Sequence, residues 1–265
     1  MNRCDGEPWP MNKILSTRSL PGFVAPYGFE RFHLEDVSID AWSIYVPAYS
    51  TWIETFRRML SPREQSRADQ FHLSSHRSRF IIAHGALRMI LADYAKLDPR
   101  RLRFVPGRHG KPALDRAFNS PDIRFNLSHS GDMAVIAVTL GHEVGVDIER
   151  IEPERAILAI AERYFSSREI STLRGLPQTD QEIAFFTCWT RKEAYIKGRG
   201  GGLSIPLRDF DVSLTPGEPA ALLASRVDAS DVDYWRLLEM PTMAGYVASL
   251  AVNRSAGKSA ICEEP

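Results

Sequence analysis

The sequence is short of cysteine, of long apolar runs and of net charge, and each shortage argues against a class of protein. Its three cysteines, Cys4, Cys188 and Cys262, lie far apart in the 265 residues and share no metal-ligand spacing with one another or with histidine. We therefore expect reduced thiols in the cytoplasm, and neither a disulfide framework nor a zinc site. No apolar run reaches the roughly 20 residues that cross a membrane. The first residues, with Asp5 and Glu7 among them, also lack the charged-then-apolar order of a signal peptide.

The charge is evenly balanced, with 33 basic and 33 acidic residues and a formal net charge of zero. Such a chain has no overall field that would attract nucleic acid or a membrane surface, so any electrostatic function must come from local clusters. The hydrophobic fraction of 44% and the charged fraction of 25% are those of an ordinary globular protein. A chain of this length can form one large domain or two smaller ones.

The apolar periodicity predicts the same order of elements twice, with a break near Glu143. The first run holds a strand at 42–46, helices at 51–60, 61–71 and 75–97, and strands at 102–105, 112–114, 123–127 and 134–139. The second run holds a strand at 144–148, helices at 154–165, 167–173 and 181–197, and strands at 210–214, 233–238 and 246–252. Only the order of elements is repeated, because no repeat of residues between the two runs is evident.

We therefore predict an α+β protein of two similar α/β halves related by a pseudo-twofold axis. Each half is expected to be a small, mostly antiparallel sheet packed with one long helix, and the active site is expected at the seam. The corresponding segments are a flexible N-terminal arm at 1–35, an N-terminal half at 36–142, a C-terminal half at 143–254 and a tail at 255–265.

Two acids occur in the run Gly145–Glu149, which reads GVDIE. On a strand, Asp147 and Glu149 point to one face and the two apolar residues to the other. Neighbouring carboxylates repel unless a cation or a proton lies between them, and oxygen ligands of this kind suit magnesium together with phosphates and water. A strand end with two solvated acids is the alternative interpretation.

A helical face is predicted for the run Trp189–Lys197, where Trp189, Glu193 and Lys197 share one side at a spacing of four residues. Glu193 is a candidate third oxygen ligand, and Lys197, one turn further on, is a candidate phosphate ligand. A surface glutamate–lysine pair would produce the same pattern. The glycine-rich run at 198–203 directly afterwards favours a loop that approaches a ligand closely.

Two further runs place small or basic residues near expected strand ends. In 125–131, which reads FNLSHSG, Ser128 and His129 are suited to donate hydrogen bonds to phosphate oxygens. In 107–114, which reads GRHGKPAL, Lys111 is a compact cation suited to phosphate, although the P-loop pattern is absent. A structural histidine and a solvated basic face are the alternatives. A catalytic serine–histidine pair is disfavoured, because the two residues are adjacent and no nucleophile elbow is present.

The expected helix at 75–97 is basic, with Arg77, Arg79 and Arg88 on it and Arg63 and Arg67 just before it. Taken in order, this basic helix and the runs GKP, FNLSHSG, GVDIE and WTRKEAYIKGRGGGL resemble the phosphopantetheinyl transferase superfamily. The resemblance is greatest to the longer surfactin-type members with two fused halves, rather than to the short trimeric holo-acyl-carrier-protein synthases, and it covers Ser61 to Val212. It implies transfer of the 4'-phosphopantetheine of coenzyme A to a serine of an apo-carrier protein. Magnesium, or manganese in its place, would be the cofactor, and adenosine 3',5'-bisphosphate the product released.

The resemblance also implies roles for particular residues. Those that match the magnesium ligands are Asp147, Glu149 and Glu193. Those that match contacts to coenzyme A are Arg67, Arg77, Gly110, Lys111, Ser128, His129 and Lys197. The expected catalytic residues are Glu193, Lys197 and His129, with Glu193 or a metal-bound water beside it as the base for the carrier serine. The N-terminal half is then expected to bind the nucleotide, and the C-terminal half to hold the metal and the phosphates.

The expected partner besides coenzyme A is an acidic carrier protein or carrier domain, docked beside Ile151–Phe165, and the two fused halves make a monomer the expected state. Three other interpretations stay open. Asp-x-Glu with basic residues also suits a metal-dependent phosphohydrolase that releases phosphopantetheine to water. A non-enzymatic module could use the basic helix alone to bind a carrier or nucleic acid, although zero net charge and few interleaved aromatics disfavour nucleic acid. An inactive relative that retains the motifs is the third.

Overall fold

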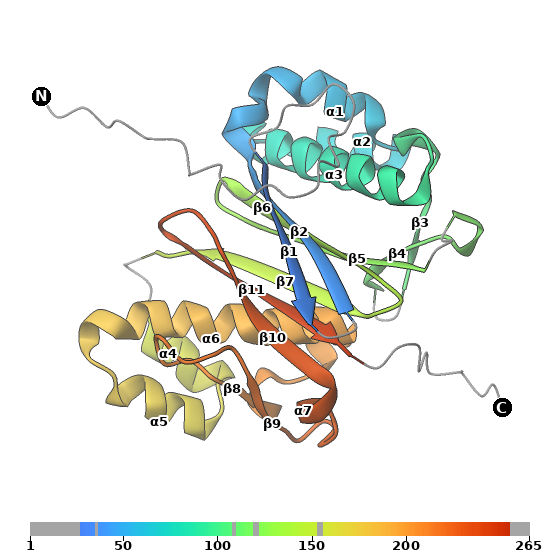
Figure 1. Ribbon diagram of the computed structural model, residues 1–265. Helices are drawn as coiled ribbons and strands as arrows, with labels where there is room; N and C mark the ends of the chain where they lie inside the picture. Colours follow the sequence, from blue (N-terminus) through green and yellow to red (C-terminus); the bar gives the residue numbers. More distant parts are fainter. Residues whose placement is uncertain (1–26, 35–36, 108–109, 119–121, 153–155, 255–265) are drawn as a thin grey trace, which may run out of the picture.

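The computed structural model describes residues 27–34, 37–107, 110–118, 122–152 and 156–254. These residues form layers in the order helices, sheet, sheet, helices (Figure 1). Within these ranges no helix is long and apolar enough to span a lipid bilayer. The tail expected at 255–265 and most of the expected N-terminal arm lie outside the described residues.

The N-terminal half is a four-stranded antiparallel sheet in the order β1-β2-β6-β5, with helices on its outer face. Its strands are β1 Tyr27–Leu34, β2 Val37–Tyr45, β5 Ile123–Ser130 and β6 Met133–Leu140. Its helices are α1 Ile53–Met59, α2 Pro62–Asp69 and α3 Ser74–Ala95, and β3 Phe104–Pro106 and β4 Pro112–Leu114 form a small hairpin. Apolar side chains of α3 share one core with residues of the sheet such as Ile44, Ile136 and Val138.

The C-terminal half is a three-stranded antiparallel sheet in the order β10-β11-β7, with α6 across its outer face. Its strands are β7 Val144–Arg150, β10 Trp235–Met240 and β11 Tyr246–Asn253, and β8 Phe210–Val212 pairs separately with β9 Leu222–Ser225. Its helices are α4 Ile157–Tyr164, α5 Ser167–Gly175, α6 Gln178–Arg199 and α7 Asp231–Tyr234. Phe165 and Leu173 share a core with Phe185 of α6, so α4 and α5 are held against that helix.

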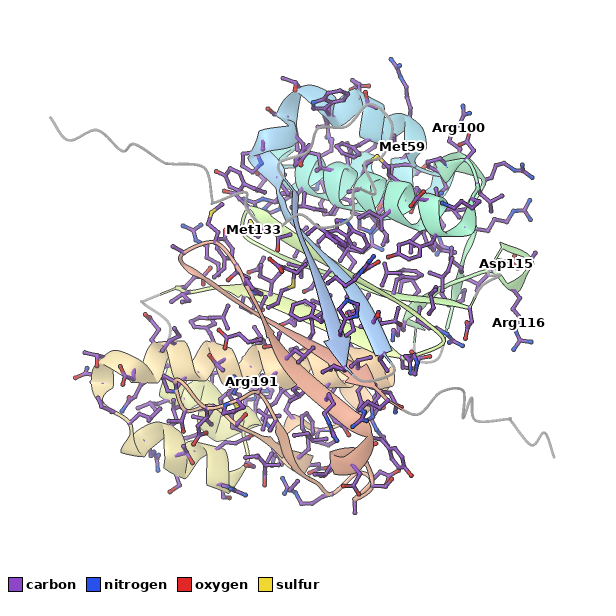
Figure 2. The ribbon with its side chains drawn as sticks, in the orientation of Figure 1. Met59, Arg100, Asp115, Arg116, Met133 and Arg191 are labelled. Atoms are coloured by element: carbon purple, nitrogen blue, oxygen red, sulfur yellow. The ribbon has the colours of Figure 1, made fainter. Side chains whose placement is uncertain are left out.

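The two sheets face one another and bury a common apolar layer, here called the seam core. Its fully buried members come from β2, β6, β7, β10 and β11: Val37, Ile39, Ala41, Met133, Val135, Ala137, Val144, Val146, Ile148, Met240, Ala248, Leu250 and Val252. Met133 is labelled in Figure 2. Because alternate strand residues point to opposite faces, the remaining residues of β6, such as Ile136, reach the core beneath α3 instead. The predicted architecture of two α/β halves with antiparallel sheets is confirmed.

The structure differs from the sequence-based prediction in elements that depend on distant partners. Residues 27–34, which the sequence pattern assigns to a loose arm, form β1, because Arg31 pairs with Asp40 of β2 and the two strands are in full register. The short strand β9 and the short helix α7 are absent from the prediction. β9 is formed by pairing with β8, a contact that no local pattern encodes.

Candidate active site

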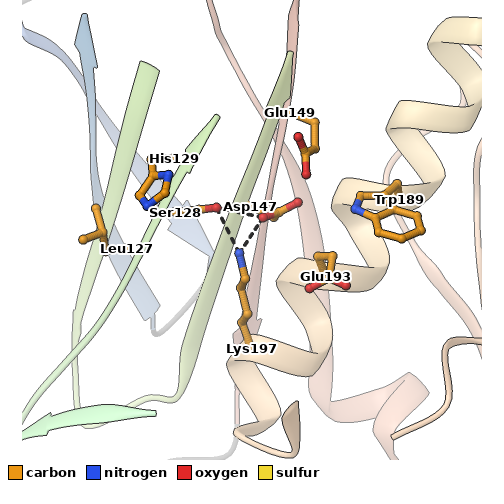
Figure 3. Close-up of a pocket in the computed structure, with 8 residues that line it drawn as sticks. All are labelled: Leu127, Ser128, His129, Asp147, Glu149, Trp189, Glu193 and Lys197. Atoms are coloured by element: carbon orange, nitrogen blue, oxygen red, sulfur yellow. Dashed lines mark hydrogen bonds and ion pairs between the residues drawn. The ribbon is translucent and has the colours of Figure 1, made fainter. Parts of the chain in front are cut away.

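A cavity of about 330 Å³ opens at the seam between β5, β7 and α6 (Figure 3). All of its lining residues belong to the runs that the sequence singled out: Leu127, Ser128, His129, Asp147, Glu149, Trp189, Glu193 and Lys197. β5 supplies the first three, β7 the two acids and α6 the last three. Three segments that are far apart in the sequence therefore present carboxylates, a lysine and an imidazole to one space.

β5 and β7 are held side by side through a row of side chains on alternate residues of β5. Asn126 Oδ1 accepts from Val146 N at 2.9 Å, Ser128 Oγ donates to Asp147 Oδ1 at 2.8 Å, and Ser130 Oγ donates to Glu149 Oε2 at 2.8 Å. This row orients both acids toward the cavity. Asn126 and Ser130 belong to the run FNLSHSG that the sequence singled out, but their contacts with β7 are not among the predicted roles, although the alternation N-x-S-x-S along a strand is a usable signal.

Lys197 lies against the carboxylate of Asp147. Its Nζ donates to Asp147 Oδ1 at 2.5 Å and to Ser128 Oγ at 2.9 Å (Figure 3). Asp147 is fully enclosed, so burial raises its pKa above the ordinary value, although Lys197 and Ser128 act in the opposite direction. The lysine thus supplies the positive charge that a buried carboxylate requires.

The carboxyl group of Glu193 is also strongly perturbed. Burial, followed by repulsion from Asp147, raises the pKa of Glu193 to about 7. Trp189, one helical turn away, lines the same cavity, and Tyr164 and Phe185 pack against its indole ring. A carboxylate with a pKa near neutrality in a cleft is suited to accept a proton or to bind a cation.

Glycine at position 145 lets α6 approach β7 closely enough to complete the cavity. A methyl group at Gly145 would meet the backbone at Ala194 O and Gly198 N and lie 2.8 Å from Gly198 Cα. Since no side chain fits there, the helix packs backbone to backbone on the strand. This close packing lets Glu193 and Lys197 of α6 line the same cavity as Asp147 of β7.

The donor set of the cavity fits a divalent cation with oxygen ligands. Among the described residues no three histidine, cysteine, aspartate or glutamate side chains are already gathered as a metal cluster. Asp147 Oδ2, however, is buried and has no hydrogen-bond partner in the described part of the chain, and the carboxylates of Glu149 and Glu193 line the same space. A buried oxygen without a partner beside two further carboxylates is a donor set that suits a divalent cation.

Lys111 does not line the cavity. Its Nζ donates to Glu143 Oε2 at 2.9 Å, Val144 O at 2.9 Å and Gly198 O at 3.1 Å. All three of its protons are therefore used within the protein. Gly110, directly before it, has a φ of 83°, a left-handed conformation that favours glycine.

The two expected arginines also lie outside the cavity lining. Arg77 donates to Phe71 O, while its Nε is buried without a partner among the described residues. Arg67 is exposed and lies over the ring of Phe80, 5.6 Å from its centroid. His84, which the sequence did not single out, stacks on the same ring, and the charges of Arg67 and His129 both act on it.

Comparison with known proteins identifies both halves of the chain. The family model of the 4'-phosphopantetheinyl transferase superfamily matches residues 143–251, and that of the 4'-phosphopantetheinyl transferase N-terminal region matches residues 41–141. The chain is 35% identical over 214 residues to the 4'-phosphopantetheinyl transferase HetI of Nostoc sp. This match covers 81% of this chain and 87% of that protein. It is 33% identical over 161 residues to the 4'-phosphopantetheinyl transferase Sfp of Bacillus subtilis, with coverage of 61% and 69%.

Proposed function

The chain belongs to the 4'-phosphopantetheinyl transferase superfamily, and we propose that its seam cavity transfers the 4'-phosphopantetheine of coenzyme A to a serine of a carrier protein. The observation that supports this proposal most strongly is the meeting of Asp147, Glu149, Glu193 and Lys197 in one cavity. Three acids and a lysine suit a diphosphate with a divalent ion better than they suit a neutral substrate.

Asp147, Glu149 and Glu193 are the residues that would hold magnesium, or manganese in its place. The bound ion would neutralise negative charge on the two phosphates of coenzyme A. Lys197 and His129 donate charge-assisted hydrogen bonds to the phosphates, and Ser128 lies beside them.

The carrier serine attacks the phosphorus attached to pantetheine, and its proton passes to a base in the cavity. A new oxygen–phosphorus bond forms as the bond to adenosine 3',5'-bisphosphate breaks, and that nucleotide leaves with the electron pair. Glu193, or a metal-bound water beside it, is the base in this proposal because Glu193 lies in the cavity next to the proposed phosphate position.

The nucleotide extends from the cavity toward the N-terminal half, where Arg77, Arg67 and Gly110 are the residues proposed for it. Lys111 is proposed to contact it as well, by exchanging one of its present acceptors for a phosphate oxygen. An acidic carrier docks beside Ile151–Phe165, next to the cavity wall that Trp189 forms. The eight lining residues of the cavity all come from one chain, which supports a monomeric enzyme. The proposed location is the cytoplasm, with neither nucleic acid nor a membrane as a partner.

The proposal is tested by incubating the protein with coenzyme A, magnesium and a panel of apo-carrier proteins. A carrier that gains about 340 Da on its serine, the mass of one phosphopantetheine arm, supports transfer, as for any covalent addition to a side chain. Release of free phosphopantetheine with no change in carrier mass would instead indicate the phosphohydrolase.

Asp147→Ala and Glu193→Ala should each abolish transfer, because each removes an oxygen ligand that the reaction requires. Circular dichroism should show both variants folded. Wild-type turnover in either purified variant would refute the metal site.

A further inference from the structure

A buried ion pair occurs twice in the molecule, once in each half. The short helices α2 and α5 both begin with the sequence S-x-R-E-x-S, at Ser61 and at Ser166, and both starts form a capping box. The glutamate of each box, Glu64 or Glu169, reaches a cation on the next long helix.

The two cations occupy equivalent positions. Arg88 and Lys192 each stand 14 positions after the first residue of helices that are both 22 residues long. Arg88 also donates to Pro99 O and Leu102 O, and Lys192 to Leu207 O and Phe210 O. Each pair therefore joins a short helix, a long helix and the segment that follows the long helix.

The two pairs have different neighbours on the long helix. The residue after Arg88 is Met89, which is buried in the apolar core. The residue after Lys192 is Glu193, which faces the cavity, and Lys197 lies one turn further on. Only the pair in the C-terminal half is thus adjacent to the proposed site.

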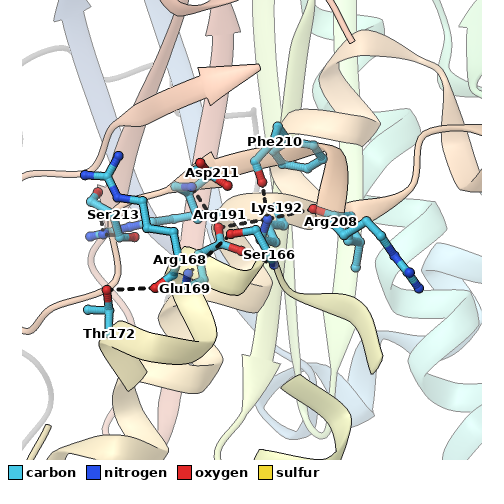
Figure 4. A network of polar contacts seen from close by, with 12 residues as sticks. Ser166, Arg168, Glu169, Thr172, Arg191, Lys192, Arg208, Phe210, Asp211 and Ser213 are labelled. Atoms are coloured by element: carbon cyan, nitrogen blue, oxygen red, sulfur yellow. Dashed lines mark hydrogen bonds and ion pairs between the residues drawn. The ribbon is translucent and has the colours of Figure 1, made fainter. Parts of the chain in front are cut away.

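The contacts of Lys192 fix the rotation of α6 about its axis and its position along that axis (Figure 4). Its side chain is 0% exposed, and its Nζ is held by Glu169 Oε1 at 2.8 Å, Leu207 O at 2.7 Å and Phe210 O at 2.6 Å. Adjacent residues of a helix point about 100° apart, so any rotation that moved Lys192 from these acceptors would move Glu193 equally. Metal-binding and catalytic groups must be held to within about 0.5 Å, which makes such a rotation costly for the reaction.

A buried ion pair is weak evidence for stability, so its presence calls for another explanation than the free energy of folding. We infer that Glu169 and Lys192 are positioning residues, which hold Glu193 and Lys197 on the metal and phosphates of the reaction. The inference rests on the proposed function of the seam cavity.

The test compares matched double variants in the two halves. Glu169→Gln with Lys192→Met removes the pair in the C-terminal half, and Glu64→Gln with Arg88→Met removes its counterpart. Each variant is characterised by thermal unfolding, by the Kd for Mn²⁺ from electron paramagnetic resonance, and by kcat and the KM for coenzyme A.

The C-terminal variant should raise the Kd for Mn²⁺ by about tenfold, the lower end of the loss seen when groups that orient metal ligands are removed, and should lower kcat more than it changes KM. The N-terminal variant should lose comparable stability but leave the Kd for Mn²⁺ unchanged. A folded C-terminal variant that binds Mn²⁺ as the wild type does would overturn the inference. Mn²⁺ binding that is weakened equally in both variants would also overturn the inference, because the effect would then follow from lost stability in general.

A second comparison applies if a double variant does not fold. Lys192→Arg keeps the charge but forces a larger group into a closed space, so the Kd for Mn²⁺ should rise, whereas Arg88→Lys should leave it unchanged. No rise in Lys192→Arg would refute positioning. Failure of the wild-type protein itself to bind Mn²⁺ would refute the proposed metal site, and the inference with it.

Discussion

At the scale of single residues, Lys197 places a positive charge beside the carboxylate that is proposed to bind the metal ion. Its Nζ lies 2.5 Å from Asp147 Oδ1. A phosphate that draws the lysine away would reduce the repulsion between its charge and a metal ion at Asp147 Oδ2, so coenzyme A and the metal should each strengthen the binding of the other.

Lys197→Met should therefore tighten Mn²⁺ binding to the protein without coenzyme A by about tenfold, and should weaken the binding of adenosine 3',5'-bisphosphate. Calorimetric titration of both ligands, singly and together, measures this coupling. Lys96→Met, at an exposed lysine paired with Asp93, is the control and should change neither affinity. An unchanged Mn²⁺ affinity in Lys197→Met would contradict this repulsion.

His84 predicts a dependence of stability on pH. Its Nδ1 contacts Phe80 O, and burial lowers its pKa from 6.5 to about 4, against the attraction of Glu64. The unfolded chain therefore binds a proton at higher pH than the native protein does. The stability associated with neutral His84 is fully present above pH 6.5 and is lost as the pH falls toward 4.

This loss is at most about 3 kcal/mol in the free energy of unfolding. Urea unfolding of the wild type and of His84→Gln at pH 7 and pH 5 measures it. The decrease between the two pH values should be smaller in His84→Gln. Equal decreases would mean that His84 titrates normally in the folded protein.

Sequence reasoning was most successful where side chains project from one regular element. Alternation along a strand predicted that Asp147 and Glu149 share a face, and helical spacing predicted that Glu193 and Lys197 do. Lys111 shows the limit. Its contacts with Glu143, Val144 and Gly198 depend on where a hairpin lies relative to the other half, which no local spacing encodes.

At the scale of elements, the close packing of α6 on β7 is the feature most sensitive to a single methyl group. Gly145→Ala would place that group against the backbone of α6, so strand and helix must separate. We expect a loss of about 3 kcal/mol in the free energy of unfolding and loss of transfer activity.

Gly175→Ala is the matched control, because a methyl group there meets nothing within 4 Å. It should be neutral, or stabilise the protein by about 0.5 kcal/mol. Denaturant unfolding and a transfer assay of both variants make the comparison. An active Gly145→Ala of wild-type stability would show that β7 and α6 can pack at a greater separation.

Most helices and strands were predictable because their apolar periods are regular, but the repeat between the halves was not seen as a repeat of residues. The structure shows that a repeat of residues is present at the starts of α2 and α5, which share the pattern S-x-R-E-x-S at Ser61 and Ser166. The matching cations, Arg88 and Lys192, differ in type and lie more than 20 residues further along the chain. Their equivalence is evident only from the contacts that they make in the folded chain.

At the scale of the whole molecule, the two halves depend on one another through the seam core. Each sheet has one face covered by its own helices and the other by the opposite sheet. A half alone would expose the second face, which carries residues such as Ile39, Val135, Val146 and Leu250. Since large exposed apolar surfaces are unfavourable in water, neither half should be stable by itself.

Residues 27–142 and 143–254, produced separately, should therefore each aggregate or stay unfolded. When they are refolded together they should form a one-to-one complex, because the seam core and the row of Asn126, Ser128 and Ser130 on β7 are both restored. Size-exclusion chromatography and circular dichroism of each half and of the mixture provide the measurement. The complex should also regain transfer activity, since β5 comes from one piece and β7 and α6 from the other. If each half folds alone and the two do not associate, the cavity lies between independent domains. It is then not part of one cooperative folding unit.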